Sequence, residues 1–144
     1  MKKGFTILEL LVVISVLVIL IGIAIPRFKG MQDAGRVAQA KAELRTMQTA
    51  IESYYMNQST PAYPADNTQI ATVLTSTGAG PQIIGAALVD PFSSTSRQYN
   101  YQYTSPYYVI SSVGVSGSGT ASVTSSGVTA SGGALCKTNA PTGC

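Results

Sequence analysis

Few residues in this chain are of types that could do chemistry. Its 144 residues include no histidine and only two cysteines, Cys136 and Cys144. Histidine and clustered cysteines are the usual metal ligands, and histidine is the most frequent general base. We see no nucleophile paired with a base and no phosphate-binding loop, so we predict no catalytic residue, no metal site and no cofactor. The one chemically unusual residue is Glu9, a carboxylate inside an apolar run.

The apolar run that contains Glu9 extends from Phe5 to Ile25, and its only other polar residues are Thr6 and Ser15. At the rise of an α-helix this length spans about 31 Å, the thickness of the hydrocarbon core of a bilayer. A charged side chain in such a segment costs a few kcal/mol or more and persists where it has a partner or a function. The run therefore predicts a transmembrane helix in which Glu9 has a purpose.

Two simpler explanations of this segment fit less well. A secretory signal peptide would account for Lys2 and Lys3, but its apolar core should be shorter, uncharged and followed by a small-x-small cleavage site. The residues from Ile23 to Pro26 supply no such site. A plain membrane anchor would explain the length of the run but not the charge of Glu9.

The sequence Lys2-Lys3-Gly4 followed by Phe-Thr-Ile-Leu-Glu-Leu-Leu closely resembles the N-terminal signature of type IV prepilins and pseudopilins. The resemblance covers residues 2 to about 30. It implies that a prepilin peptidase cuts between Gly4 and Phe5, removes residues 1–4 as a leader and methylates the new amine of Phe5. It also implies three further partners: an inner-membrane assembly platform, a cytoplasmic ATPase and many copies of the same chain.

The charge of Glu9 has a physical interpretation in such an assembly. Cleavage would leave an ammonium at Phe5, one helical turn away, and the two charges could pair within a chain or between neighbouring chains. In a bundle of apolar helices, the amine of an incoming subunit would neutralise the buried carboxylate of the subunit before it. A subunit shifted from that register would leave a charge unpaired. We interpret Glu9 as an assembly residue that sets the register.

The composition agrees with a protein that buries much of its surface against copies of itself. Charged residues make up 10% of the chain, against about 25% in soluble proteins. The net charge is +3, but without Lys2 and Lys3 seven basic side chains face six acidic ones. Such a balance does not indicate nucleic acid as the main partner.

A second helical pattern follows the apolar run. From about Gln32 to Met56 apolar residues recur every three or four positions, which is the pattern of an amphipathic helix. The members of this stripe are Val37, Ala40, Leu44, Met47, Ile51 and Tyr54. The charged residues of the segment, among them Glu43 and Glu52, fall off the stripe.

The simplest structure joins both patterns into one helix from Phe5 to about Met56. Residues 5–25 would form the transmembrane or filament-core part, and residues 26–56 would continue as the amphipathic part. Gly22 and Pro26 predict a kink or a weak point between the two, because both residues disfavour a helix interior.

Residues 57–144 are predicted to form a globular head, so the fold class is α+β: a long N-terminal helix packed on a small antiparallel sheet, as in type IV pilins. Tyr99–Tyr103 alternates strictly and Tyr107–Val113 is rich in strand formers, which predicts a hairpin. Tyr99, Tyr101 and Tyr103 share one face, where they can cover the helix stripe; a sugar-binding tyrosine ladder is the alternative.

Other parts of the head are less determined. A short helical turn is expected at Ile70–Leu74. The tract Gly114–Gly133 consists mainly of Gly, Ser, Thr, Ala and Val, and could form edge strands near Ala121–Val123 and Gly127–Thr129 or a loop. We expect it to bury little and to lie on the outside of an assembly. Two cysteines in an exported head favour a Cys136–Cys144 disulfide, with free thiols as the alternative.

The head combines features of two subfamilies. Asp90-Pro91-Phe92 followed by tyrosine-rich strands resembles the major pseudopilins of type II secretion, but Gly114–Gly119, in the place of their calcium loop, has no carboxylate. The Cys136–Cys144 loop resembles the closed end of type IVa pilins. We therefore favour a pilin, held in the cytoplasmic membrane before assembly and placed in an extracellular or periplasmic filament afterwards. A pseudopilin is the alternative, and a membrane-anchored binding domain is a remote one.

Overall fold

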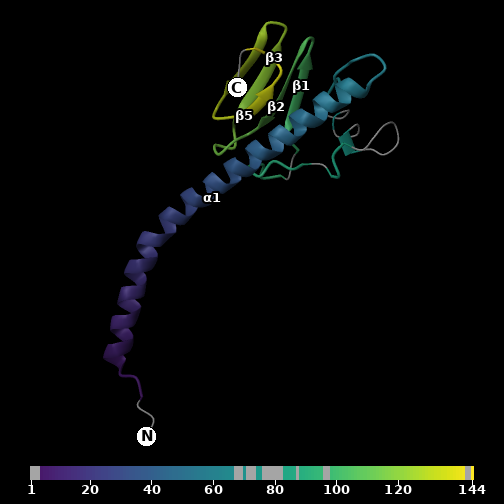
Figure 1. Ribbon diagram of the computed structural model, residues 1–144. Helices are drawn as coiled ribbons and strands as arrows, with labels where there is room; N and C mark the ends of the chain where they lie inside the picture. Colours follow the sequence, from purple (N-terminus) through teal and green to yellow (C-terminus); the bar gives the residue numbers. More distant parts are fainter. Residues whose placement is uncertain are drawn as a thin grey trace. The chain divides into compact units, whose positions relative to one another are not determined.

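A computed structural model describes residues 4–66, 70, 74–75, 83–86, 88–95, 98–141 and 144 of the chain. The long helix α1 (Ile7–Asn57) is the first element and precedes all the strands (Figure 1). The strands are β1 (Asn100–Thr104), β2 (Tyr107–Ser112), β3 (Thr120–Thr124), β4 (Gly127–Ser131) and β5 (Leu135–Thr138). The α+β prediction is confirmed. The chain divides into two compact units, Met1–Gly35 and Arg36–Cys144, and we call the second the head unit.

The bounds of α1 agree with the predicted helix to within two residues. At the C-terminal end of α1, the side-chain amide of Asn57 donates a hydrogen bond of 2.8 Å to the backbone carbonyl of Ser53. Pro61 and Pro64 follow at once and cannot continue the ladder of backbone hydrogen bonds. Pro26 lies inside α1, which is assigned as one helix through it. The predicted kink at Gly22 and Pro26 stays a prediction.

The first sheet is antiparallel, with strand order β1-β2-β5. β1 and β2 form the predicted hairpin, in a register that sets Tyr101 opposite Ile110. β5 pairs with the other edge of β2, and Ser111 lies opposite Cys136. The last strand before the C-terminus is thereby built into the sheet that faces the helix.

The main core of the head unit lies between α1 and this sheet. Four members of the predicted stripe are buried in this core: Ala40, Leu44, Met47 and Ile51. Ala50, which was not part of the predicted stripe, is buried with them. Tyr99, Tyr101 and Tyr108 are buried in the same cluster, and Tyr103 packs against it half-buried. The prediction that the tyrosine face covers the helix stripe is confirmed, so these side chains serve packing.

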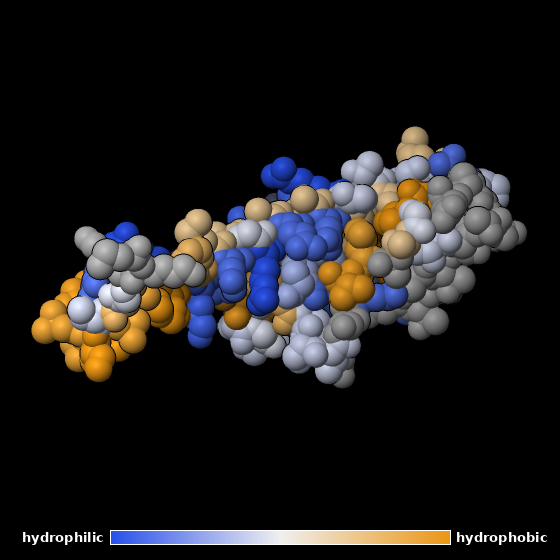
Figure 2. Space-filling view, turned by 90° about the horizontal axis from the view of Figure 1, so that it is seen from below, coloured by the Kyte–Doolittle hydropathy of each residue, from blue (hydrophilic) through white to orange (hydrophobic). Residues whose placement is uncertain are grey.

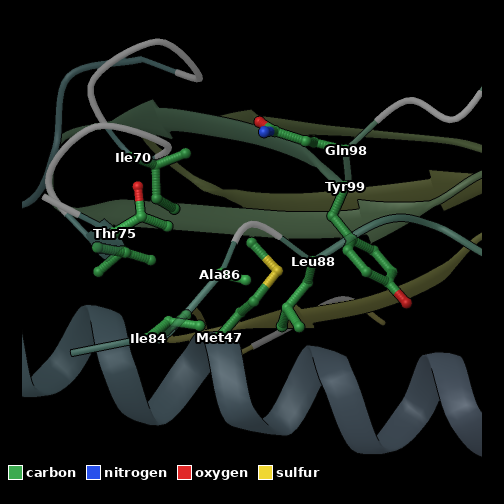
Figure 3. Close-up of a pocket in the computed structure, with 9 residues that line it drawn as sticks. Met47, Ile70, Thr75, Ile84, Ala86, Leu88, Gln98 and Tyr99 are labelled. Atoms are coloured by element: carbon green, nitrogen blue, oxygen red, sulfur yellow. The ribbon is translucent and has the colours of Figure 1, made fainter. Parts of the chain in front are cut away.

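Ile70 and Leu74 close one end of this core, and both are buried. Ile70, Leu74 and Thr75 are helical, as the predicted turn requires, whereas residues 71–73 lie outside the described part of the chain. Figure 3 shows Met47 rising from α1 toward Leu88 and Tyr99 around a remaining gap. The gap measures about 20 Å³, which is room for about one water molecule. It is an imperfection of packing rather than a ligand site.

The tract Gly114–Gly133, left open between strands and loop, forms the hairpin β3–β4. The expectation that it buries little is wrong at Ala121 and Val128, which form a second small core with Val109 of β2. The reason is the period of two along a strand: Ala121 points inward while Ser122 bonds outward to Thr129 at 3.0 Å. Small residues can therefore supply a face of a core when the strands turn them toward Val109 of β2.

The main core predicts a large effect of one truncation. Leu44 is 1% exposed in the centre of the helix face, so Leu44→Ala should lower the free energy of unfolding by about 2–5 kcal/mol. Val115→Ala, at a residue that is 56% exposed, should change it by less than about 0.5 kcal/mol. Denaturant titration of the detergent-solubilised chain by circular dichroism measures both. Equal effects of the two substitutions would contradict the packing described above.

Candidate assembly site

The first turn of α1 holds the residues that the sequence singled out for processing and assembly. The helix begins at Ile7 rather than at the predicted Phe5, because Thr6 acts as its N-terminal cap. The Thr6 hydroxyl accepts a hydrogen bond of 3.2 Å from the Glu9 backbone amide, and the Thr6 carbonyl accepts one of 3.1 Å from Leu10. Thr6-x-x-Glu9 is the spacing of a capping box, a signal that our reading of the sequence missed.

This cap gives Glu9 a local role as well. An acidic side chain in the first turn is favoured by the partial positive charge at a helix N-terminus. That effect is worth less than the cost of a carboxylate in an apolar environment. It therefore explains the position of Glu9 in the helix but not its presence in the apolar run.

The side chains around Glu9 are apolar and uncovered. Ile7 and Leu8 are 86% and 75% exposed, and the other large apolar residues up to Ile25 are exposed as well. Figure 2 shows apolar side chains gathered at this end of the chain, with a few polar ones among them. By its length and composition, α1 is long and apolar enough to cross a membrane.

The polar groups of the apolar run are satisfied except for one. The Ser15 hydroxyl donates 2.8 Å to the Leu11 carbonyl, a bond within the helix that lets a hydroxyl remain among apolar residues. Among the described residues no cation lies in contact with the Glu9 carboxylate. Its charge is left for a partner from outside the described chain.

Gly4 and Phe5 precede the helix and are exposed. A Cβ atom at Gly4 would meet nothing within 4 Å. The structure of the chain itself therefore does not require glycine at this position. Phe5 lies just before the helix, so the pairing of its amine with Glu9 after cleavage stays a prediction.

In the head unit, two carboxylates of α1 accept hydrogen bonds from tyrosines of the head. The Tyr99 hydroxyl donates 2.7 Å to Glu43. Glu52 accepts 2.7 Å from Tyr108 and 3.1 Å from Tyr63. The sequence had placed both carboxylates off the stripe and so outside the core. The available signal was the number of tyrosines, because each buried phenol needs an acceptor.

These contacts perturb the tyrosines strongly. Burial, with Glu52 as the next cause, raises the pKa of Tyr63 from 10.0 to about 12. Burial and the hydrogen bond to the adjacent carboxylate raise the pKa of Tyr99 and of Tyr108 even further. Burial also raises the pKa of Tyr101, whose hydroxyl donates 2.8 Å to the Pro64 carbonyl. All four phenols are held in the protonated, hydrogen-bond-donating form.

Asp90 fastens the loop before β1 to the end of β2. Its buried carboxylate accepts 2.8 Å from the Ser112 hydroxyl, 2.9 Å from the Val113 amide and 3.0 Å from the Phe92 amide. In this chain the Asp-Pro-Phe motif therefore has a structural role, because Asp90 holds the loop before β1 to the end of β2 by hydrogen bonds.

Cys136 and Cys144 form a disulfide, with Cα atoms 5.4 Å apart. Cys136 lies in β5, so the bond ties the C-terminal segment to the edge of the three-stranded sheet. The two cysteines are therefore a structural link, in line with the favoured alternative from the sequence.

An uncovered apolar helix that is capped by Thr6 and carries Glu9 in its first turn continues into an amphipathic half packed on antiparallel strands, and this arrangement defines the class of proteins with a type IV pilin-like layout. A family model described as the prokaryotic N-terminal methylation motif matches residues 1–25. Together with the relatives described next, this match supports assignment of the chain to the type IV pilin and pseudopilin family.

Several curated proteins are similar to part of the chain. The type IV major pilin protein PilE of Neisseria gonorrhoeae is 32% identical over 68 residues, 47% of this chain and 40% of PilE. The type IV major pilin protein PilA of Myxococcus xanthus is 38% identical over 54 residues, 38% of this chain and 24% of PilA. A fimbrial protein of Pseudomonas aeruginosa is 38% identical over 52 residues, 36% of this chain and 34% of that protein. The matches thus span less than half the length of these relatives. No solved structure matches the chain significantly.

The tyrosine pKa values predict a loss of stability at high pH. The unfolded chain releases phenolic protons near pH 10, whereas the folded chain holds that of Tyr63 to about pH 12. The unfolded state therefore binds fewer protons above pH 10, and the free energy of unfolding should fall from there to about pH 12. Denaturant titrations between pH 8 and 12 measure this decline.

Variants of single tyrosines assign the decline to one side chain. Tyr63→Phe should flatten part of it, whereas Tyr107→Phe, at a residue outside the carboxylate contacts described above, should leave it unchanged. A decline of the same slope in both variants would show that the Glu52–Tyr63 contact does not hold the proton.

Proposed function

We propose that this chain is a structural subunit of a type IV filament. A prepilin peptidase cuts it between Gly4 and Phe5, Phe5 is N-methylated, and the apolar half of α1 holds the subunit in the cytoplasmic membrane. An inner-membrane platform driven by a cytoplasmic ATPase then polymerises it into a helical filament of many copies. The work is structural, and the chain carries no catalytic role.

The observation that carries this proposal is the uncovered apolar surface of α1 around an unpaired Glu9. An apolar helix of this length needs lipid or other helices around it. Lipid alone would cover the surface but would leave the carboxylate in hydrocarbon. Neighbouring copies that each bring a Phe5 amine supply both apolar cover and an opposite charge. The relatives named as pilins and fimbrial proteins support the same conclusion.

Within this class we favour a surface pilus, which serves adhesion, motility or DNA uptake, over a secretion pseudopilus. The disulfide that ties the C-terminal segment to β5 supports the pilus, as does the lack of carboxylates in Gly114–Gly119. Asp90-Pro91-Phe92, which resembles the pseudopilin motif, favours the alternative of a secretion pseudopilus. Negative-stain microscopy of sheared cells separates the two, because a pilus gives long detached fibres that contain this chain.

Processing predicts a defined mature N-terminus. Mass spectrometry of the assembled chain should give a first residue of N-methyl-Phe5. Gly4→Leu should block cleavage, because Gly4 contacts nothing in the chain itself and the requirement for a small residue then belongs to the peptidase. An assembled chain that retains Met1 would contradict the proposal.

Removal of the Glu9 carboxylate predicts a separation of insertion from assembly. Glu9→Leu should insert into the membrane at least as well as the unaltered chain, because a desolvation cost of a few kcal/mol is removed. Filament yield should nevertheless fall, because the incoming Phe5 amine would be buried without a partner. The measurement compares the membrane-bound and sheared-filament pools.

Ser15→Ala is the matched control for Glu9→Leu. It removes a polar group from the same apolar run, but one whose hydrogen bond is made within the helix. Assembly of Ser15→Ala should be normal. Normal filament yield from Glu9→Leu would rule out the charge pairing.

A further inference from the structure

Cationic side chains from two elements surround one groove of the head unit. Lys41 and Arg45 come from α1, and Lys137 comes from β5. The groove measures about 370 Å³, and its lining also includes Leu44, Leu135 and the Cys136–Cys144 disulfide. We call this feature, defined by the three cations, the cationic groove.

Among the described residues, no Asp or Glu side chain forms an ion pair with these three cations. Lys41 and Arg45 are four residues apart on one helix face, a spacing at which like charges repel, and Lys137 adds a third. No Asp or Glu lines the cationic groove. The side chains of the three cations take part in none of the hydrogen bonds or ion pairs of the described residues. Because the charges repel one another, an anion bound among them would be favoured.

Most carboxylates of the chain are already engaged. Asp90, Glu43 and Glu52 accept hydrogen bonds inside the head unit. Glu9 belongs, under the proposed function, to the Phe5 amine of a neighbouring copy. Of the six acidic residues of the chain, Asp66 also takes part in an interaction, and Asp33 is the one that is left.

Asp33 lies on α1. It precedes Lys41 by eight residues, about 12 Å of helix, which puts the two side chains out of contact within one chain. A carboxylate on α1 of another copy has no such constraint.

The proposed Glu9 pairing brings Asp33 to the right level. If the Phe5 amine of one copy meets Glu9 of the next, parallel copies of α1 are offset by about four residues. Asp33 of the first copy then lies level with Val37 of the second, one helical turn before Lys41. Side chains on a helix lean toward its N-terminus, so the Lys41 ammonium reaches back toward that level.

We propose that Asp33 of each subunit binds the cationic groove of its neighbour. This contact rests on the proposed function and deepens it, because it adds a second charge pairing that fits the same register as Glu9. It lies on the charged part of the subunit surface, where water screens a single pair, and Arg45 and Lys137 add positive potential around Lys41.

Charge reversal tests the contact in living cells. Asp33→Lys alone, and Lys41→Glu/Arg45→Glu together, should each lower the ratio of sheared filament to membrane-bound subunit by about tenfold, because each places like charges opposite one another. All the reversals combined restore opposite charges and should recover most of the yield. Formation of the Cys136–Cys144 disulfide in the membrane pool shows that each variant has folded. Failure of the combined variant to recover, with its disulfide formed, would overturn the proposal.

Chemical coupling tests the contact directly. A carbodiimide joins a carboxylate to an amine only where the two touch, so filaments of the unaltered chain should give a peptide that links Asp33 to Lys41 or Lys137. Filaments grown from a mixture of ¹⁵N-labelled and unlabelled subunits should give mixed-isotope linked peptides, which proves that the link joins two copies. Linked peptides of a single isotope, or none at all, would overturn the proposal.

Two further outcomes separate this inference from the proposed function. If the unaltered chain forms no filament, the proposed function itself fails. If filaments form and depend on Glu9, but the reversals leave their yield unchanged, only the Asp33 contact is wrong. In that case binding of double-stranded DNA fragments that is lost in Lys41→Glu/Arg45→Glu would assign the cationic groove to an external polyanion instead.

Discussion

The rest of the structure depends on an apolar helix surface that nothing in the described chain covers. An apolar helix in water exposes far more hydrophobic area than a monomer tolerates, so α1 up to Ile25 needs lipid or other helices around it. The chain meets this constraint by keeping its own core elsewhere. The main core begins at Ala40 and is complete within the head unit. The core of the head therefore does not depend on what surrounds the apolar half.

Polar groups follow the same division of labour. Thr6 and Ser15 bond within the helix, so they add little cost in any apolar environment. Among the described residues, the Glu9 carboxylate has no cation in contact with it. A cation supplied by another molecule would lower the cost of this charge in an apolar environment. In the head unit, by contrast, Glu43 and Glu52 are each engaged by tyrosine hydroxyls. The carboxylates of the head unit thus have hydrogen-bond donors in the same chain, whereas the Glu9 carboxylate contacts no cation among the described residues.

The tyrosine contacts also explain how a small sheet can hold a long helix. Large rings fill the space between α1 and β1–β2, and their hydroxyls end on carboxylates of the helix. Apolar packing supplies most of the stabilisation, since it scales with buried area. The hydrogen bonds add direction, because a phenol buried without an acceptor would cost more than it gains. Together they determine which face of α1 is covered.

Periodicity in the sequence was enough to predict the elements on which function depends. The apolar run, the stripe from Val37 to Tyr54 and the alternation of Tyr99–Tyr103 each report a local property, and local geometry repeats with a fixed period. The odd charge of Glu9 and the glycine before Phe5 were equally visible, because they break a pattern. The Cys136–Cys144 pairing followed from there being no other cysteine.

Tertiary structure alone decided the features that depend on contacts between distant residues. The side chains of Gly114–Gly133 are too small to give a clear hydrophobic pattern in the sequence. Only the contact with Val109 in the folded chain shows that Ala121 and Val128 belong to a core. The roles of Glu43 and Glu52 lay in tyrosines up to 56 positions away. A sequence lists donors, acceptors and charges, but only the fold decides which of them meet, because a hydrogen bond or an ion pair depends on distance in space.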